Sequence, residues 1–192
     1  LDPRKCSRAT VVIIADKISL FPQEYYEQGL AVVTATTRQR NSDTMEPRIK
    51  SLNYLNNILV KLEATHAGVM EAIMLNSQGY VVEGSGSNVF IVNKKGELIT
   101  PPAFLGILEG ITRNTVLHLA GAEGIPVREG IFTRHELYAA RECFLTGTAA
   151  EIIPVISVDR RSVGAGVPGP LTRRLMGRFH DYVRQEGAPV YP

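Results

Sequence analysis

Lys50 stands directly before a segment with helical periodicity, and Tyr54 follows it at the spacing of one helical turn. We expect this helix to run to about His66, with one buried apolar stripe made of Leu52, Leu55, Ile58, Leu59 and Leu62. A lysine at the mouth of an apolar helix is chemically notable. On local pattern alone, the ordinary interpretation is a side chain whose stem lies along the helix and whose amine reaches water.

Three further segments combine residue types that can bind anions or hold a proton. Glu83 ends the apolar run in "YVVEGSGSN" just before a glycine-serine turn, where a plain strand-end carboxylate in water would have the same pattern. Gly110, Ile111 and Thr112 open a helix, whose free amides can bind a phosphate or form an ordinary N-cap.

The third segment, "LTGTAAE", is a small-residue turn between two apolar runs, with Gly147, Thr148 and Ala149 at its centre. Its amides and hydroxyl could face an anion, although a simple hairpin would look alike. Taken together, the four features supply a lysine amine, a phosphate site at a helix start and a carboxylate able to hold a protonated ring nitrogen. These are the protein groups that pyridoxal phosphate requires.

Other catalytic patterns are missing from the sequence. It has no Walker loop, no cysteine or histidine pair at zinc spacing and no nucleophile elbow. The four histidines are separated from one another along the chain, which argues against a Ser-His-Asp or metal mechanism: His66, His118, His135 and His180.

The elements that position these residues can be predicted from turn residues and apolar periodicity. Strands are expected in "ATVVIIA" and over residues 30–37, with a short helical connection in "SLFPQEYYEQG" between them. A polar loop, "RQRNSDTMEP", then leads to Lys50. The first strand has nothing before it with which to pair, and the sequence lacks an initiating methionine, so we expect the chain to be a fragment.

Four short apolar runs follow the Lys50 helix in quick succession: "EAIMLN", "YVVEG", "NVFIVN" and "ELIT". Their spacing predicts an antiparallel meander. The rest of the chain predicts a helix over residues 112–123, a strand from Val127, a short helix in "TRHELYAA", two strands in "ECFLTGTAAEIIPVISVD" and a closing amphipathic helix. Strands mixed with a few helices indicate an α+β protein.

The totals describe an ordinary globular chain: 192 residues, 44% hydrophobic and 21% charged. A formal net charge of +2, with basic residues scattered among acids, argues against a nucleic-acid partner. No apolar run approaches the length of a membrane span. Two cysteines cannot form a disulfide framework, and we expect a cytoplasmic protein in which Cys143 is a buried strand residue.

Four motifs carry a family resemblance. "RIKSLNYL", "EGSGSNVF", "LEGITRN" and "FLTGTAAEI" stand in the order and approximate spacing of the fold-type IV pyridoxal-phosphate enzymes, and the sequence resembles that family over nearly all of the chain from Leu30. The family includes branched-chain aminotransferases, D-amino acid aminotransferases and aminodeoxychorismate lyases.

The resemblance implies a role for each matching residue. Lys50 matches the lysine that holds the cofactor as an internal aldimine, and Tyr54 takes the place of a tyrosine near the ring's phenolic oxygen in branched-chain enzymes. Glu83 matches the acid that bonds the pyridine nitrogen, and Leu108 an apolar residue packed on the ring.

The remaining residues that match the family's motifs are ones that bind anionic groups there. Ile111 and Thr112 match the phosphate cradle, and Thr148 matches a second phosphate ligand. The turn of Gly147, Thr148 and Ala149 would face the phosphate and the α-carboxylate of the substrate.

The resemblance also implies the fold and the organisation of domains. We expect residues 35–192 to be the large pyridoxal-phosphate domain of fold type IV, with an antiparallel, barrel-like sheet packed with helices. Residues 1–34 would be a remnant of the small N-terminal domain and the interdomain connection. In whole members of the family the small domain contributes an arginine to the phosphate and side chains to the substrate pocket, and the enzymes work as homodimers or higher homo-oligomers. A fragment of this length would therefore keep most cofactor ligands but little or no catalytic activity.

Branched-chain aminotransferase is the first choice within the family. "TGTAAEI" and the pair Asn53 and Tyr54 resemble those enzymes most, while "IKSLN" is shared with D-amino acid enzymes. The implied reaction is transamination of leucine, isoleucine and valine with 2-oxoglutarate. A D-amino acid aminotransferase and a 4-amino-4-deoxychorismate lyase are the alternatives. An inactive cofactor-binding or oligomerisation fragment is the alternative of another class, and the presence of both Lys50 and Glu83 argues against it.

Overall fold

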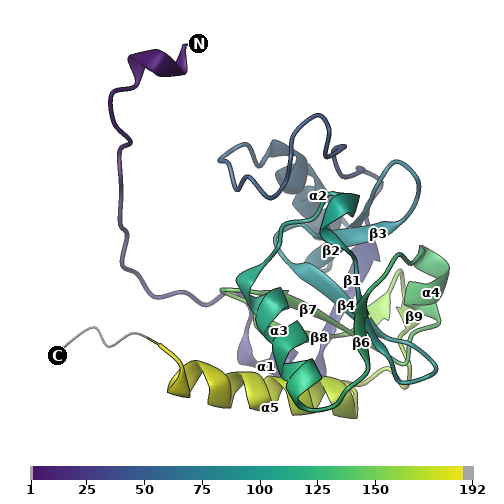
Figure 1. The fold of residues 1–192 in the computed structure, drawn as a ribbon. Coiled ribbons are helices and arrows are strands. Elements are labelled where there is room, and N and C mark those ends of the chain that lie inside the picture. Colours follow the sequence, from purple (N-terminus) through teal and green to yellow (C-terminus); the bar gives the residue numbers. More distant parts are fainter. Residues whose placement is uncertain (1, 188–192) are drawn as a thin grey trace.

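A computed structural model describes residues 2–187, and in them the strands form one nine-stranded sheet. Six strands follow one another by hydrogen bonding, and a further pairing between the first and last of them closes a small barrel: β3 (Val81–Gly84), β2 (Glu71–Leu75), β1 (Leu30–Thr34), β8 (Glu151–Val158), β7 (Glu142–Gly147) and β4 (Asn88–Val92). From β4 the sheet continues as β5 (Leu98–Thr100) and β6 (Val127–Glu129), and β9 (Arg161–Ser162) pairs with β8. Figure 1 shows the arrangement.

The predicted α+β class with a barrel-like sheet is confirmed. The pairings from β2 through β5 are antiparallel, as the meander predicts. The sheet as a whole is mixed, however, because β1 runs parallel to both β2 and β8, and β5 runs parallel to β6. The strand expected over residues 30–37 ends at Thr34 and lies inside the barrel wall. The predicted division of the chain after residue 34 stays a prediction.

Successive residues of a barrel strand point to opposite faces of the sheet and pack in different hydrophobic clusters. In β2, Ile73 and Leu75 join one cluster, while Ala72 and Met74 join a second one beneath α2 (Leu55–His66). In the third cluster, Phe90 and Phe144 stack with ring centroids 4.9 Å apart. Because both faces of these strands are covered, β2, β3 and β4 are buried at every position.

Four helices besides α2 complete the body, and each of them was predicted: α1 (Gln23–Gln28), α3 (Ile111–Ala122), α4 (Arg134–Tyr138) and α5 (Pro170–Gln185). Helices α3 and α5 pack against each other and against β7 (Figure 1). Leu175 and Phe179 of α5 are buried against this layer, as its apolar spacing predicts, whereas Val183 is exposed. Cys143 is buried in β7, as expected.

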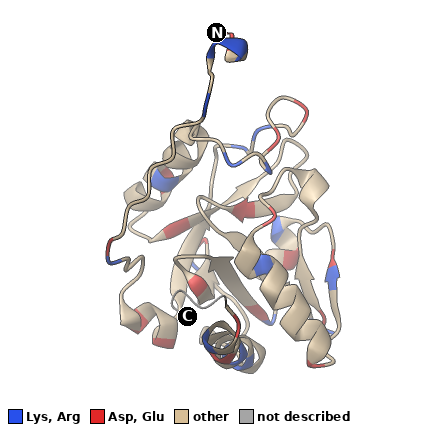
Figure 2. Ribbon diagram, turned by 60° about the vertical axis from the view of Figure 1, so that its left-hand side comes forward, with Lys and Arg blue, Asp and Glu red and all other residues tan. Residues whose placement is uncertain are grey.

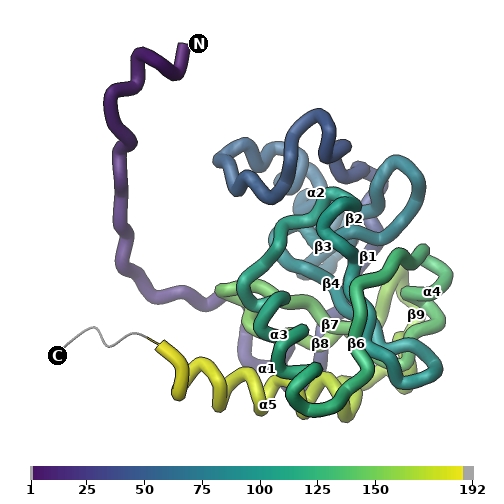
Figure 3. The backbone as a smooth tube through the Cα atoms, viewed as in Figure 1, coloured from purple at the N-terminus to yellow at the C-terminus, as the bar shows by residue number. Residues whose placement is uncertain are grey.

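The strand predicted in "ATVVIIA" is wrong. Residues 8–20 form an arm without regular structure, which leaves the body as an extended segment (Figure 3). Val11, Val12, Ile13 and Ile14 are between 75% and 90% exposed. A β-strand needs a neighbour that accepts and donates its backbone hydrogen bonds, and no described segment lies alongside this one.

The buried stripe predicted for the Lys50 helix is also wrong. Helix α2 begins at Leu55, and the face it buries carries Val60 and Ala64. The five predicted residues are exposed instead, from 45% at Leu59 and Leu62 to 101% at Leu52. The helical spacing was real, but it identifies an apolar face and not what covers that face.

Charged residues of both signs are spread over the body in Figure 2. On the surface between α3 and α5, Glu123 pairs with both Arg174 and Arg178. Within residues 2–187, no helix has the length and apolar character needed to cross a membrane. The same residues contain no cluster of three metal-ligating side chains.

Candidate active site

The strand register gathers polar residues at one end of the barrel. Glu83 near the end of β3 pairs with Asn88 at the start of β4, and Asn88 pairs in turn with Thr146 near the end of β7. All three residues are at most 6% exposed. The fixed alternation of side chains along three hydrogen-bonded strands therefore brings together residues that are up to 63 positions apart in the sequence.

Glu83 is a buried acid surrounded by N–H donors. Its Oε1 accepts from Gln39 Nε2 at 2.8 Å, and its Oε2 accepts from the Leu108 N–H at 3.0 Å and from Asn88 Nδ2 at 3.5 Å. Burial raises the pKa of Glu83 to about 8, although the Leu108 N–H, the positive charge of Lys50 and the Gln39 amide all oppose the shift. Glu83 is thus a group that can hold a proton near neutral pH.

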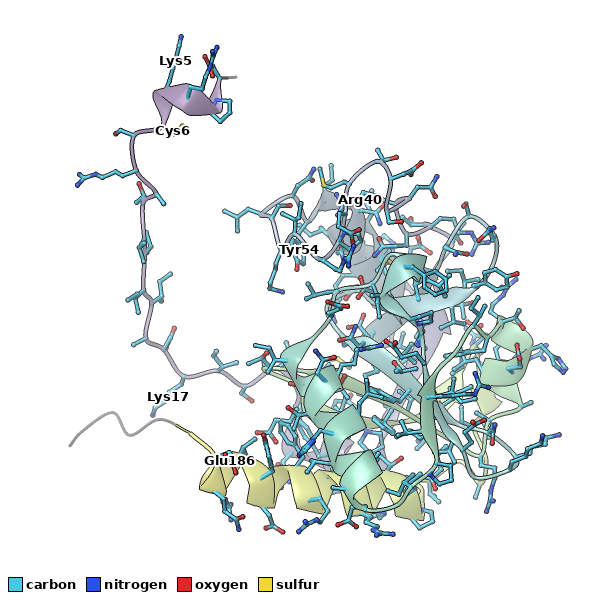
Figure 4. The ribbon with its side chains drawn as sticks, viewed as in Figure 1. Lys5, Cys6, Lys17, Arg40, Tyr54 and Glu186 are labelled. Carbon is cyan, nitrogen blue, oxygen red and sulfur yellow. The ribbon has the colours of Figure 1, made fainter. Side chains whose placement is uncertain are left out.

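Lys50 reaches the same place from the loop that follows β1. Its Nζ donates to Tyr54 Oη at 3.0 Å, and the amine lies 5.5 Å from the Tyr54 ring centroid. The two residues touch even though the regular helix begins only after Tyr54. Figure 4 shows Tyr54 and Arg40 in the part of the molecule that carries α2, above α3. Asn57, in the first turn of α2, anchors this segment by donating to the Ser85 carbonyl at 2.9 Å.

Helix α3 presents its N-terminus to this end of the barrel. Its N-cap is Gly110, and no side chain caps it. The first-turn N–H groups of a helix have no acceptor within the helix, so Ile111 and Thr112 bring free amides to an anion-binding position. Gly110 must lack a side chain, because a Cβ there would overlap Asn88 Oδ1. The contact is fixed from the other side, since Asn88 Nδ2 donates to the Leu108 carbonyl at 2.8 Å.

The turn between β7 and β8 separates two cavities. Gly147 and Thr148 line the cavity that contains Lys50, whereas Ala149 lines a neighbouring cavity of about 510 Å³. Glu151 follows the turn with φ at 53°, in the left-handed region that costs a non-glycine residue about 1 kcal/mol. Its Oε2 lies 2.7 Å from Nε2 of His180 on α5, so His180 contacts the end of the turn.

A cavity of about 400 Å³ unites the residues that the sequence singled out. It is lined by Lys50, Tyr54, Glu83, Leu108, Gly110, Ile111, Thr112, Gly147 and Thr148, together with Asn57, Gly84, Ser85, Gly86, Ser87, Asn88, Glu109 and Thr146. Of the nine predicted site residues, the structure separates only Ala149 from this set.

The lining fits pyridoxal phosphate by its chemistry. It offers a primary amine for an aldehyde, a carboxyl group for a ring nitrogen and helix-terminal amides for a phosphate. Ser87 and Thr146 also line the cavity, and their buried hydroxyls, Ser87 Oγ and Thr146 Oγ1, have no hydrogen-bond partner within the described residues. Buried polar atoms are ordinarily paired, so both remain available to a polar ligand.

Sequence reasoning missed Gln39, Asn88 and Thr146. Asn88 and Thr146 lie within quoted motifs, and the alternation of their strands was a signal that they share a wall with Glu83. Gln39 gave no signal, because it lies in a polar loop and its partner Glu83 is 44 residues away.

Comparison with known proteins shows what the chain is similar to. The sequence profile of the family described as amino-transferase class IV matches residues 2–158. A protein of Methanocaldococcus jannaschii named as a putative branched-chain-amino-acid aminotransferase is 46% identical over 191 residues, which cover 100% of this chain and 65% of that protein.

Solved structures agree with this assignment. The Escherichia coli branched-chain amino acid aminotransferase matches with a TM-score of 0.82 and 40% identity, over 88% of this chain and 56% of that one. The Thermobaculum terrenum enzyme, solved in its pyridoxal-phosphate form, matches with a TM-score of 0.80 and 44% identity, over 84% and 53% of the two chains. The chain therefore spans between about half and two thirds of the length of these relatives. On the profile match and the shared fold, this chain belongs to the amino-transferase class IV family of fold type IV.

Proposed function

We propose that this chain forms the cofactor-binding part of a pyridoxal-phosphate aminotransferase that acts on leucine, isoleucine and valine, with 2-oxoglutarate as the amino acceptor. One observation carries the proposal. A single cavity holds the Lys50 amine, the buried Glu83 carboxyl and the open N-terminus of α3, on three separate segments of the chain.

Pyridoxal phosphate, when bound, supplies an aldehyde that joins primary amines and a ring that accepts electrons from the substrate's α-carbon. Lys50 is the primary amine of the cavity wall and the residue we assign to covalent attachment. With the cofactor bound, Lys50 Nζ would be the group that takes up and returns the α-proton of the substrate, as a general base and acid. Tyr54 Oη, which accepts a hydrogen bond from Nζ, orients the amine.

The surroundings of Glu83 suit it to control the protonation of the cofactor's ring nitrogen. With its pKa raised to about 8 by burial, it keeps a proton at pH 7 that it can pass to a basic nitrogen beside it. The N–H groups of Leu108 and Gln39 then stabilise the carboxylate that remains. Glu83 and the ring nitrogen would thus share one proton, with the positive charge on the ring favoured by the adjacent carboxylate.

The two anionic groups of the reactants have candidate sites at the start of α3 and on the turn after β7. The amides of Ile111 and Thr112, at the positive end of the α3 dipole, suit the cofactor phosphate. Thr148, on the turn after β7, suits a second contact to that phosphate, and the same turn suits the substrate α-carboxylate. Fixed anchoring of the phosphate would hold the ring in place while its covalent bond to Lys50 is broken and remade.

The choice of amino acid rests on the relatives. The M. jannaschii and E. coli proteins carry branched-chain names, and the T. terrenum enzyme with that name was solved with pyridoxal phosphate. A homodimer or higher homo-oligomer is part of the proposal, and the exposed apolar face of α2 supports it, since such faces are usually covered in an assembly.

Reductive trapping tests the covalent step. The chain is mixed with pyridoxal phosphate, reduced with borohydride, digested and mapped by mass spectrometry. We expect one phosphopyridoxyl label, on Lys50, and its loss in Lys50→Ala, while Lys17→Ala in the exposed arm keeps it. Label spread over many surface lysines, or none at all, would refute the proposal.

Substrate choice needs a separate assay on a polypeptide that carries this sequence together with the remaining length of its relatives. L-leucine, D-alanine and aminodeoxychorismate are compared as substrates, with 2-oxoglutarate as acceptor for the two amino acids. We expect turnover of L-leucine, slowed strongly by Glu83→Gln. Turnover of D-alanine or aminodeoxychorismate without L-leucine would select one of the two alternative reactions.

A further inference from the structure

Gln39 is a buried amide whose hydrogen-bonding groups are all used. It is 4% exposed. Its Nε2 donates to Glu83 Oε1 at 2.8 Å and to the Gly106 carbonyl at 2.9 Å, and its Oε1 accepts from the Arg40 N–H at 3.1 Å. Two donors and one acceptor are thus satisfied in one arrangement, which leaves the amide no alternative orientation of equal quality.

The backbone fixes Gln39 as firmly as its side chain does. Its N–H donates to the Leu75 carbonyl at 2.9 Å, which ties the loop after β1 to the end of β2. Gly106 approaches closely with φ at 89°, where a Cβ would meet the Arg40 carbonyl oxygen at 3.4 Å. Gln39 therefore joins three segments: the loop that leads to Lys50, strand β3 and the turn that precedes Leu108.

We propose that Gln39 is a positioning residue that holds the Glu83 carboxyl in the plane and orientation needed to meet the cofactor ring nitrogen. The inference rests on the proposed function, because it concerns the ring that Glu83 would face. It extends that function to a residue outside every motif of the family resemblance.

The geometry explains how the Gln39 side chain can fix the orientation of the Glu83 carboxyl group. Glu83 Oε1 is held by Gln39 and Oε2 by the Leu108 N–H, so rotation of the carboxyl group would break both bonds. The Gly106 bond ties Gln39 to the turn that supplies Leu108, and the two donors therefore move together. An N–H donor also favours the charged form of the carboxyl, which connects orientation to protonation.

The proposal is tested first without cofactor, by following the ¹³Cδ resonance of Glu83 in labelled chain as the pH is changed. Glu83→Gln assigns the signal. Gln39→Met keeps the length of the side chain and removes its donors, and we expect the Glu83 midpoint to rise by about one pH unit through loss of the donor. Gln78→Met, on an exposed turn, is the matched control and should leave the midpoint unchanged.

A second variant keeps the test decisive if Gln39→Met does not fold. Gln39→Glu retains the shape of the side chain but places a second carboxyl group beside Glu83. The two acids then lose their protons in two steps, and the midpoint of the second step should lie above the Glu83 midpoint of the parent chain, because like charges repel. A midpoint equal to that of the parent chain in whichever variant folds would overturn the assignment.

The second readout is the pH dependence of the bound cofactor's visible absorption. We expect Gln39→Met to shift its midpoint and Gln78→Met to match the parent chain; a Gln39→Met profile that also matches the parent would contradict the proposal. If the parent chain takes up no pyridoxal phosphate, the proposed function fails, yet the cofactor-free titration still decides whether Gln39 holds the Glu83 carboxyl. The two ideas are therefore separable by experiment.

Discussion

The amine of Lys50 lies 3.0 Å from the hydroxyl of Tyr54, although the regular part of α2 begins only at the next residue. The contact therefore depends on the turns that precede α2 and not on helical spacing. Ser51 N–H donates to the Ile49 carbonyl at 2.7 Å, and Tyr54 N–H donates to the Leu52 carbonyl at 3.0 Å. The phenol consequently acts as an orienting partner for an amine on an otherwise exposed segment.

Tyr54→Phe should weaken the uptake of pyridoxal phosphate without unfolding the chain. Phenylalanine keeps the ring beside Lys50 but cannot accept its hydrogen bond, and the loss of one such bond corresponds to about a fivefold rise in Kd. Titration of the visible absorption measures the effect. Tyr25→Phe in α1, remote from the cavity, is the control, and equal affinities in the two variants would exclude Tyr54 as a partner of the cofactor site.

Glu83→Gln should change how stability depends on pH in the cofactor-free chain. Burial raises the pKa of Glu83 from 4.5 to about 8, so the folded chain retains a proton that the unfolded chain has lost. Stability then falls as the pH rises from about 4.5 to about 8, by about 1 kcal/mol for each unit. Glu83→Gln has no such titrating group, so its stability should not fall in this way. The difference in melting temperature between the variant and the parent chain should therefore grow in favour of the variant between pH 5 and pH 8.

Glu123→Gln provides a control of opposite sign. Arg174 and Arg178 lower the pKa of Glu123, so that carboxylate stabilises the fold above its unfolded pKa and the contribution is lost only as the pH falls through the lowered value. Between pH 5 and pH 8 its substitution should give a constant difference. A constant difference for Glu83→Gln as well would show that Glu83 titrates like an ordinary carboxyl group.

Gly110→Ala should damage the proposed phosphate site. The new Cβ would overlap Asn88 Oδ1, which is held through the bond from Asn88 to the Leu108 carbonyl. Either Asn88 or the start of α3 must move, and we expect pyridoxal-phosphate affinity to fall at least about tenfold and the free energy of unfolding to fall by about 1–3 kcal/mol. Gly121→Ala in the same helix meets no atom within 4 Å and should stabilise the fold by about 0.5–1 kcal/mol. Similar losses from both substitutions would point to a general effect on α3.

The exposed face of α2 should matter for assembly and not for the fold of one chain. Leu59 is 45% exposed, so Leu59→Asp removes only a partly buried side chain and should lower the free energy of unfolding of a single chain by about 1–2 kcal/mol without unfolding it. Light scattering should show that the variant has a smaller assembly mass than the parent chain. Ile131→Asp, with the same exposure on another surface, should leave the mass unchanged, and an unchanged mass for Leu59→Asp would remove α2 from the proposed interface.

Local sequence patterns predicted the barrel strands because each has an apolar run bounded by turn residues, as in "EAIMLNSQG" and "NVFIVNKKG". They failed for Val11 to Ile14 and for the α2 stripe for one physical reason. Hydrophobicity indicates that a surface prefers to be covered, but only the three-dimensional arrangement tells whether anything lies against it.

The candidate site likewise has features that the sequence predicts and features that it does not. Motifs located Lys50, Glu83 and the α3 start, because each needs a recognisable residue at a recognisable position in an element. The hydrogen bonds around Glu83 were not predictable, since they depend on how a loop, a strand and a turn meet. The turn of Gly147, Thr148 and Ala149 is predicted to face the site as one unit, yet successive residues of a tight turn can face different sides, and Ala149 lines the neighbouring cavity.

The turn between β7 and β8 has three residues between Gly147 and Glu151, which pair across the hairpin. It forms a partition between the two cavities. One side carries Thr148 toward the Lys50 cavity, and the other carries Ala149 toward the chamber lined by Arg173 and His180. The backbone at Glu151 is left-handed, and its carboxylate contacts His180 on α5. The same short strip of backbone thus forms part of the wall of both chambers, so a change in its length would alter the shape of both.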